Sequence, residues 1–274
     1  MNSDYPSKNE NNLWSFKNIA GLSQRKSRDD SQCMLVEGKH PIEEALKAKL
    51  PIHQAFVLEG ANENSLPAML CPIDPQEVDS KTMSRLANAQ SAPPCLAVFS
   101  QPEPLPNEAL NTHKGLIVVL DEIQDPGNLG TLLRSSVAFG ADAVVLLGNA
   151  VDAYNPKVIR ASAGLQFALP VFKMTYQDFA ALANRNNAPV YITSSHVEET
   201  LYNINFQKHC YIVLGNEGNG VNEHFAQSLS NARFITIPIN PRVESLNVAI
   251  CGSILLAFAA AQQGNPVIQE LPPL

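Results

Sequence analysis

The chain has 274 residues, 45% of them hydrophobic, and it carries a formal net charge of −7 with five cysteines. Its length and apolar content predict two domains with buried cores, and its acidic balance excludes a protein that coats nucleic acid through charge alone. Because the sequence has no C-x-x-C pair, no secretory signal and no apolar run of roughly 18 residues, we expect a cytoplasmic protein with reduced thiols and no membrane span.

The N-terminal part of the chain predicts a small α/β domain. Residues 1–16 are polar and predict a disordered tail. Strands are expected at 33–38, 53–60 and 95–100, and helices at 40–50 and 79–90. Because these strands alternate with helices, residues 17–100 predict one compact α/β domain.

A basic segment lies at the start of this domain. Lys17, Arg25, Lys26 and Arg28 fall within twelve residues, and no acidic residue lies between them. The segment is either a patch that contacts an anionic partner or an ordinary solvated face, and both interpretations stay open from charge alone.

Residues 101–114 carry prolines at alternate positions and predict an interdomain linker. Beyond the linker, continuous apolar runs predict buried strands at 116–120, 143–147, 167–172, 190–194, 211–215 and 234–238. Such runs, separated by helices such as 129–139 and 179–187, are typical of a parallel sheet that is covered on both faces. Residues 115–264 therefore predict a doubly wound α/β domain with ligands beyond the carboxyl ends of its strands, and residues 265–274 predict a tail.

Two polar segments of the second domain follow predicted strands. In NLGTLLR (128–134), Asn128 is a candidate N-cap, and Arg134 leans back toward the helix N-terminus, where an anion can bind. In GNEGNG (215–220), the glycines permit close backbone approach to a ligand, and Glu217 lies at the tip. This second segment matches neither the dinucleotide fingerprint nor the Walker loop. A cap, a surface arginine and a plain turn are the structural alternatives.

A third polar segment, PRVESLNVA (241–249), precedes the last apolar helix. Ser245 or Glu244 is expected to cap that helix. Capping needs one polar residue, whereas this segment supplies several within six positions.

Together and in this order, the three segments resemble the SpoU (TrmH-like) RNA 2′-O-ribose methyltransferases of the SPOUT superfamily. The family motifs are N-x-G-x-x-x-R, G-x-E-x-x-G, and an I-P strand end followed by S-L-N-V-A, here IPINPRVESLNVA (237–249). PKVIRASAG (156–164) also resembles the family, and LVEGKHPIEEAL (35–46) resembles the substrate-binding domain that precedes many of its catalytic domains.

The resemblance implies an α/β SPOUT domain with a parallel sheet and a deep trefoil knot, preceded by a smaller α/β substrate-binding domain. It also implies that the knot binds S-adenosyl-L-methionine. Carried over by position, the cofactor-binding residues are Gly215, Ile237, Leu246, Ser194 and Asn216.

The implied reaction is methyl transfer to a ribose 2′-hydroxyl of RNA. The catalytic residues implied by the motifs are Arg134, Asn128, Glu217, Ser245 and Asn247. Arg134 is either the base or the group that binds a phosphate and stabilises the alkoxide, and its high pKa as an arginine favours the second role. No metal is needed, because the sulfonium leaving group supplies its own driving force.

The resemblance further implies that the first domain binds RNA, through Arg25, Lys26, Arg28 and Lys39. Large-subunit rRNA is favoured over tRNA because a large domain precedes the catalytic one. A homodimer through the knotted domain is expected, and the helix at 246–263 is apolar nearly all round. Burial of that helix inside a monomer is the alternative.

Two other functions are alternatives to RNA methylation. A Rossmann-type oxidoreductase requires G-x-G-x-x-G after the first strand of the sheet, which this chain lacks. A catalytically inactive RNA-binding relative is disfavoured because the motif residues are intact. Arg242 departs from the small or polar residues expected in its loop, and the sequence assigns it no role.

Overall fold

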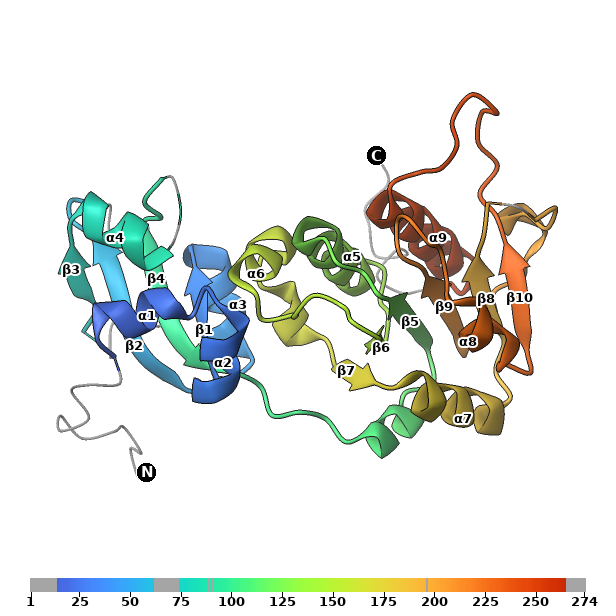
Figure 1. The fold of residues 1–274 in the computed structure, drawn as a ribbon, viewed down its shortest axis with the longest axis horizontal. Helices are drawn as coiled ribbons and strands as arrows, with labels where there is room; N and C mark the ends of the chain where they lie inside the picture. The colour runs from blue at the N-terminus through green and yellow to red at the C-terminus, as the bar shows by residue number, and fades with distance from the viewer. Residues whose placement is uncertain (1–13, 62–73, 88, 90, 196, 265–274) are drawn as a thin grey trace. The chain divides into compact units, whose positions relative to one another are not determined.

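The computed structural model describes residues 14–61, 74–87, 89, 91–195 and 197–264. Nearly all of the two predicted tails lies outside these residues. The chain packs into two units: unit 1 comprises Met1–Glu103 and Asp152–Ala168, and unit 2 comprises Pro104–Val151 and Leu169–Leu274 (Figure 1). Among the described residues, no helix is long and apolar enough to cross a membrane.

Unit 1 contains a four-stranded sheet of order β1-β4-β2-β3, in which β4 is antiparallel to both of its neighbours and β3 is parallel to β2. The strands are β1 (Cys33–Glu37), β2 (Ile52–Leu58), β3 (Gln76–Val78) and β4 (Cys95–Ser100). The helices of its N-terminal part are α1 (Phe16–Gly21), α2 (Arg25–Ser31), α3 (Lys39–Lys47) and α4 (Ser80–Ala87).

Both faces of this sheet are buried, which explains why β1 is apolar at four of its five positions. Leu35 packs on the face covered by Ile19 of α1 and Met83 of α4. Its neighbours Met34 and Val36 pack on the opposite face, together with Ile42 of α3. Side chains alternate between the faces of a strand, so a strand covered on both sides reads as a continuous apolar run.

Residues 152–168 pack differently from the rest of the predicted 115–264 domain. This segment, with α6 (Pro156–Ser162) and η4 (Leu165–Ala168), packs in unit 1 although it was assigned to the 115–264 domain. Gly164 has a φ of +80°, and a Cβ placed there would lie 2.6 Å from the Cα of Pro41 in α3. The strand predicted at 167–172 instead begins later, as β7 (Val171–Met174), because residues 165–168 form η4.

Unit 2 contains a six-stranded, entirely parallel sheet of order β10-β8-β9-β5-β6-β7. Besides β7, its strands are β5 (Leu116–Asp121), β6 (Ala143–Leu147), β8 (Val190–Thr193), β9 (Cys210–Leu214) and β10 (Ala232–Ile235). Its helices are η3 (Asn107–Thr112), α5 (Pro126–Ala138), α7 (Tyr176–Asn186), η5 (Leu201–Asn203), α8 (Glu223–Gln227) and α9 (Val248–Gln262). The segment predicted as an interdomain linker therefore contains η3.

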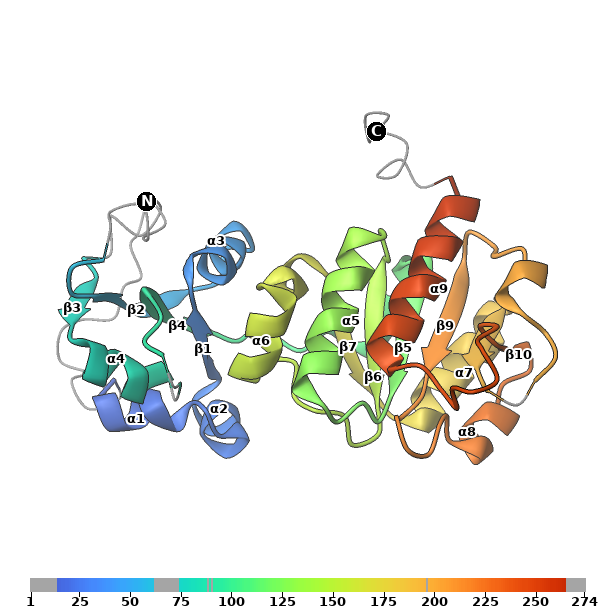
Figure 2. The same ribbon diagram turned by 90° about the horizontal axis from the view of Figure 1, so that it is seen from above.

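Helices cover both faces of this sheet, as the continuous apolar strands predict. Helices α5 and α9 lie side by side on one face, and α7 and α8 lie on the other (Figures 1 and 2). Ile117 and Val119 of β5 pack toward Phe179 of α7 and Phe225 of α8. The fold class is confirmed as α/β with a parallel sheet, and all strand ends that precede the motifs point to one edge.

Candidate active site

One hydrogen-bonded bridge in unit 2 joins the three sequence motifs. Asn128 Nδ2 donates to Glu217 Oε1 at 2.5 Å, and Asn247 Nδ2 donates to Asn128 Oδ1 at 2.9 Å. These side chains come from the start of α5, the loop after β9 and the start of α9. Residues that lie 89 and 119 positions apart are thus brought together at the carboxyl edge of the sheet, where a doubly wound fold binds its ligands.

The helix caps differ from those predicted. Asp125, not Asn128, caps α5 by accepting a hydrogen bond from Asn128 N–H at 2.8 Å. Asn247, not Ser245 or Glu244, caps α9, and its Oδ1 accepts from the N–H groups of Ala249 and Ile250. Because Asp125 caps α5, the Asn128 carboxamide is available for the bridge.

The loop at 215–220 is held in shape by its own backbone. Asn216 and Gly220 exchange two main-chain hydrogen bonds, of 3.0 and 2.9 Å. Asn216 Oδ1 accepts from the N–H groups of Gly218 and Asn219. A Cβ at Gly215 would lie 2.2 Å from the carbonyl carbon of Gly220, so Gly215 is required for closure of the loop itself.

Arg134 and Ser245 are not joined to this bridge. Arg134 is exposed on α5, and among the described residues no side chain forms an ion pair or hydrogen bond with it. Ser245 is exposed in the loop before α9, and Arg242 lies in the same exposed loop. An exposed guanidinium without a protein partner has its donors available for a substrate phosphate.

The residues predicted to bind the cofactor surround the same sheet edge. Ser194 follows β8, Asn216 follows β9, and Ile237 and Leu246 lie between β10 and α9. Within the described part of the chain, no backbone–backbone hydrogen bond uses the main-chain groups of Ile237 or Leu246. Main-chain groups without a backbone partner fit a nucleoside cofactor that is held by main chain.

One buried acid at this edge was not predicted from the sequence. Asp121, the last residue of β5, is 1% exposed, and Tyr176 Oη donates to its Oδ1 at 2.6 Å. Burial, followed by the hydrogen bond to Asp121, raises the pKa of Tyr176, so the phenol remains protonated at neutral pH. A lone acidic residue directly after an apolar strand is the signal that could have identified Asp121.

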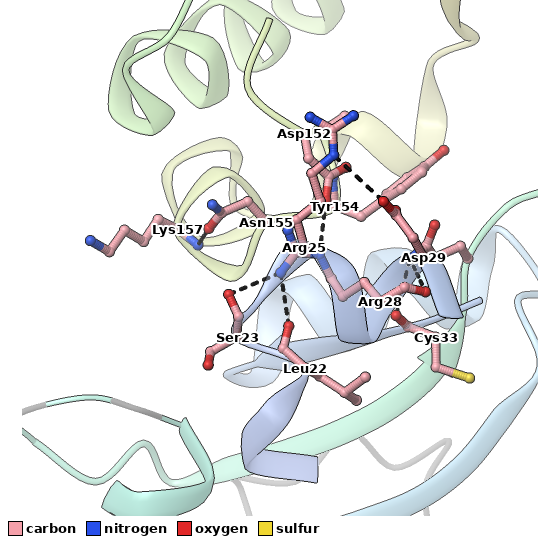
Figure 3. Close-up of polar contacts among 12 residues, drawn as sticks. Leu22, Ser23, Arg25, Arg28, Asp29, Cys33, Asp152, Tyr154, Asn155 and Lys157 are labelled. Atoms are coloured by element: carbon pink, nitrogen blue, oxygen red, sulfur yellow. Dashed lines mark hydrogen bonds and ion pairs between the residues drawn. The ribbon is translucent and has the colours of Figure 1, made fainter. Parts of the chain in front are cut away.

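The predicted RNA contact of Arg28 is wrong. Arg28 is 1% exposed and forms a buried ion pair, with Nη2 2.6 Å and Nε 2.8 Å from Asp152 Oδ2 (Figure 3). Its Nη1 donates to the carbonyl oxygens of Leu22 and Ser23. The guanidinium thus serves the fold of unit 1, and no donor is left at the surface for a phosphate.

The other residues predicted to bind RNA lie nearer the surface of unit 1. Arg25 and Lys26 are exposed on α2, and Arg25 pairs loosely with Asp29 at 3.6 Å. Lys39 is half-buried at the first position of α3. Across the described ranges, no group of three or more His, Cys, Asp or Glu side chains is placed to hold a metal ion.

Comparisons with known proteins agree with this arrangement. A sequence model of the SpoU rRNA Methylase family matches residues 115–257, more than half of the chain, and an MRM3-like substrate binding domain matches residues 15–97. The chain is 30% identical to the 23S rRNA (guanosine(2553)-2′-O)-methyltransferase of Bacillus subtilis, over 86% of this chain and 91% of that protein.

Two further similarities cover nearly the whole chain. An uncharacterized tRNA/rRNA methyltransferase of Synechocystis is 30% identical over 90% of both chains. The crystal structure of an AdoMet-bound rRNA methyltransferase from Sinorhizobium meliloti superposes with a TM-score of 0.77, at 25% identity, over 93% of this chain and 97% of that one.

The family match and the AdoMet-bound structural relative show that S-adenosyl-L-methionine is the cofactor. The chain belongs to the SpoU rRNA methylase family and is an S-adenosyl-L-methionine-dependent RNA 2′-O-methyltransferase.

Proposed function

We propose that this enzyme methylates a ribose 2′-hydroxyl of large-subunit rRNA, and that Arg134, Asn128, Glu217, Ser245 and Asn247 form its catalytic site. The bridge from Glu217 through Asn128 to Asn247 carries this proposal, because it orders all three motifs around one point. The Bacillus subtilis relative acts on 23S rRNA, and a substrate-binding domain precedes the catalytic domain here. These observations favour rRNA over tRNA.

The chain's own residues have distinct roles in the proposed reaction. The bound cofactor supplies an activated methyl group, and the loops that carry Gly215, Ile237 and Leu246 hold it, with Ser194 and Asn216 beside them. Arg134, exposed and unpaired among the described side chains, binds the phosphate next to the target ribose and stabilises the oxyanion that develops at O2′. The bridge keeps Glu217 and Asn247 fixed, so that the ribose meets a preorganised site.

Unit 1 provides the RNA-binding surface in this proposal. Arg25, Lys26 and Lys39 remain its candidate contacts, whereas Arg28 is excluded because it is buried. Arg25 and Lys26 are adjacent and exposed, so both can reach backbone phosphates with little desolvation.

We further propose that the enzyme is a cytoplasmic homodimer with a knotted catalytic domain. Ile250 and Ile254 lie one turn apart on α9, and 54% and 38% of their surfaces are exposed. Exposed apolar side chains at this spacing favour a partner helix face. After the edge strand β10 the chain returns to pack α9 against α5, which supports a threaded C-terminal segment. The described cysteines form no disulfide, in keeping with a reducing compartment.

Exchange of Arg134 tests the catalytic assignment. We expect the purified enzyme to transfer tritium from labelled S-adenosyl-L-methionine to protein-free 23S rRNA, with weaker transfer to bulk tRNA. Arg134→Lys should lower kcat at least tenfold, because lysine cannot reproduce the bidentate guanidinium contact. Arg185→Lys is the matched control, because Arg185 is also exposed on a helix, α7, and it should retain activity. Full activity of Arg134→Lys would exclude both roles considered for this side chain, and preferential labelling of tRNA would overturn the rRNA assignment.

A further inference from the structure

A buried carboxylate behind the 215–220 loop has no role in the reaction described so far. Asp121 accepts two hydrogen bonds, from Tyr176 Oη at 2.6 Å and from the N–H of Asn222 at 2.8 Å. No lysine, arginine or histidine of the described chain forms an ion pair with it. A buried carboxylate is costly unless its oxygens are hydrogen-bonded, so this group depends strongly on both donors.

Both donors to Asp121 are themselves fixed. Burial and the hydrogen bond keep Tyr176 protonated, and Gly148 leaves it space, since a Cβ there would lie 2.6 Å from Tyr176 Oη. Asn222 caps α8, and its Oδ1 accepts from the N–H of Phe225 at 3.0 Å. The backbone leaving the 215–220 loop is therefore attached at Asn222 to the end of β5 and to α8.

The entrance of the loop is attached to the next residue of the same strand end. Asn216 Nδ2 donates to the carbonyl oxygen of Glu122 at 3.0 Å. Glu122 has a φ of +53°, which is uncommon for a residue with a side chain and indicates a locally constrained backbone. Asp121 and Glu122 thus hold the exit and the entrance of the loop, respectively.

We infer that Asp121 is a positioning residue, supported by Tyr176, which acts through the Asn222 N–H to fix the cofactor-binding loop and, with it, Glu217 against Asn128. This inference rests on the proposed role of the 215–220 loop in binding S-adenosyl-L-methionine. It adds to the site a residue that contacts neither cofactor nor RNA.

Two near-isosteric variants alter the hydrogen bonds that Asp121 accepts. Asp121→Asn keeps the size of the side chain but replaces one acceptor oxygen with an amide NH2 group and removes the negative charge that the Tyr176 hydroxyl and the Asn222 N–H stabilise. Tyr176→Phe removes one donor and leaves the Asn222 contact in place. Tyr211→Phe is the matched control, because the Tyr211 hydroxyl, on β9, is also hydrogen-bonded and accepts from Asn186 Nδ2 at 3.1 Å.

The experiment measures S-adenosyl-L-methionine affinity by calorimetry, RNA affinity by fluorescence anisotropy, and hydrogen exchange of peptides that span 215–222. We expect Asp121→Asn to raise the Kd and KM for the cofactor at least tenfold and to accelerate exchange in this loop, while the RNA Kd changes less than twofold. Tyr176→Phe should raise the cofactor Kd about threefold, and Tyr211→Phe should leave it unchanged. A merely structural role would lower the melting temperature without this selectivity.

Some results would overturn the inference. One is unchanged cofactor affinity and loop exchange in Asp121→Asn. The other is an equal effect of Tyr176→Phe and Tyr211→Phe on the cofactor Kd. This pair of variants tests the inference if Asp121→Asn does not fold. If the wild-type enzyme itself does not bind S-adenosyl-L-methionine, the proposed role of the loop fails instead.

Discussion

The side chain of Asn128 offers one donor group and one acceptor group, and the bridge uses both. Its Nδ2 donates to Glu217 and its Oδ1 accepts from Asn247, so neither aspartate nor glutamine is an equivalent replacement. A carboxylate would present only acceptors, and a longer amide would not keep both distances. This dual use explains why an asparagine stands at the start of α5 although Asp125 provides the cap.

Exchanging the donor and the acceptor in the hydrogen bond between Asn128 and Glu217 tests the bridge. Asn128→Asp should lower kcat/KM at least 30-fold, because it places a second carboxylate against Glu217 while the acceptor for Asn247 remains. Adding Glu217→Gln should recover much of the loss, since the new amide can donate to the new carboxylate. Tritium transfer under single-turnover conditions is the measurement. Asn111→Asp in η3 is the control, because its Nδ2 and Oδ1 are also both hydrogen-bonded, outside the bridge. Failure of the second substitution to restore any activity would argue against the bridge.

The strands of the parallel sheet were predicted better from the sequence than the side-chain contacts that cap and join the elements. All strands of the parallel sheet except β7 begin within two residues of the predicted position, because continuous apolar runs reflect burial on both faces. The caps of α5 and α9 were assigned incorrectly, because several adjacent polar residues can each cap a helix and tertiary contacts decide among them. The bridge itself was not predictable, since its partners are 89 and 119 residues apart.

The 215–220 loop is an element whose closure depends on one glycine. A Cβ at Gly215 would lie 2.2 Å from backbone of Gly220, whereas the nearest atom to a Cβ at Gly218 is a side-chain oxygen at 3.5 Å. We expect Gly215→Ala to cost about 2–3 kcal/mol of stability, near the upper end for overpacking, and to weaken cofactor binding at least tenfold.

Gly218→Ala in the same loop is the comparison. It should change stability by less than about 1 kcal/mol, because φ there is not positive and the added methyl meets only ordinary contact. Thermal melting measures the stability of each variant, and calorimetric titration measures its affinity for the cofactor. Similar losses in the two variants would show that the loop is rigid throughout and not closed at Gly215 in particular.

At the scale of the whole molecule, the units do not follow the chain in order. Residues 152–168 connect β6 to β7 of unit 2, yet they supply Ile159 to the core of unit 1 and Asp152 to buried Arg28. The chain therefore passes between the units three times, and the apparent linker at 101–114 is only one of the connections. Composition predicted a linker at 101–114, but it could not reveal which core the apolar residues of α6 would join.

Two Asp→Asn variants test whether residues 152–168 stabilise unit 1. Asp152→Asn leaves the charge of Arg28 buried without a counter-ion, so we expect a loss of about 2–3 kcal/mol, somewhat below the cost in a fully buried pair, because Asp152 is 15% exposed. Asp29→Asn alters the exposed pair with Arg25, in which the two side chains are 47% (Arg25) and 59% (Asp29) exposed, and should cost under about 1 kcal/mol.

The single tryptophan, Trp14, lies in unit 1 and stacks on His53, so its fluorescence during urea unfolding reports this unit. Equal shifts of the urea midpoint in the two variants would mean that the Asp152–Arg28 pair stabilises unit 1 no more than an exposed pair does.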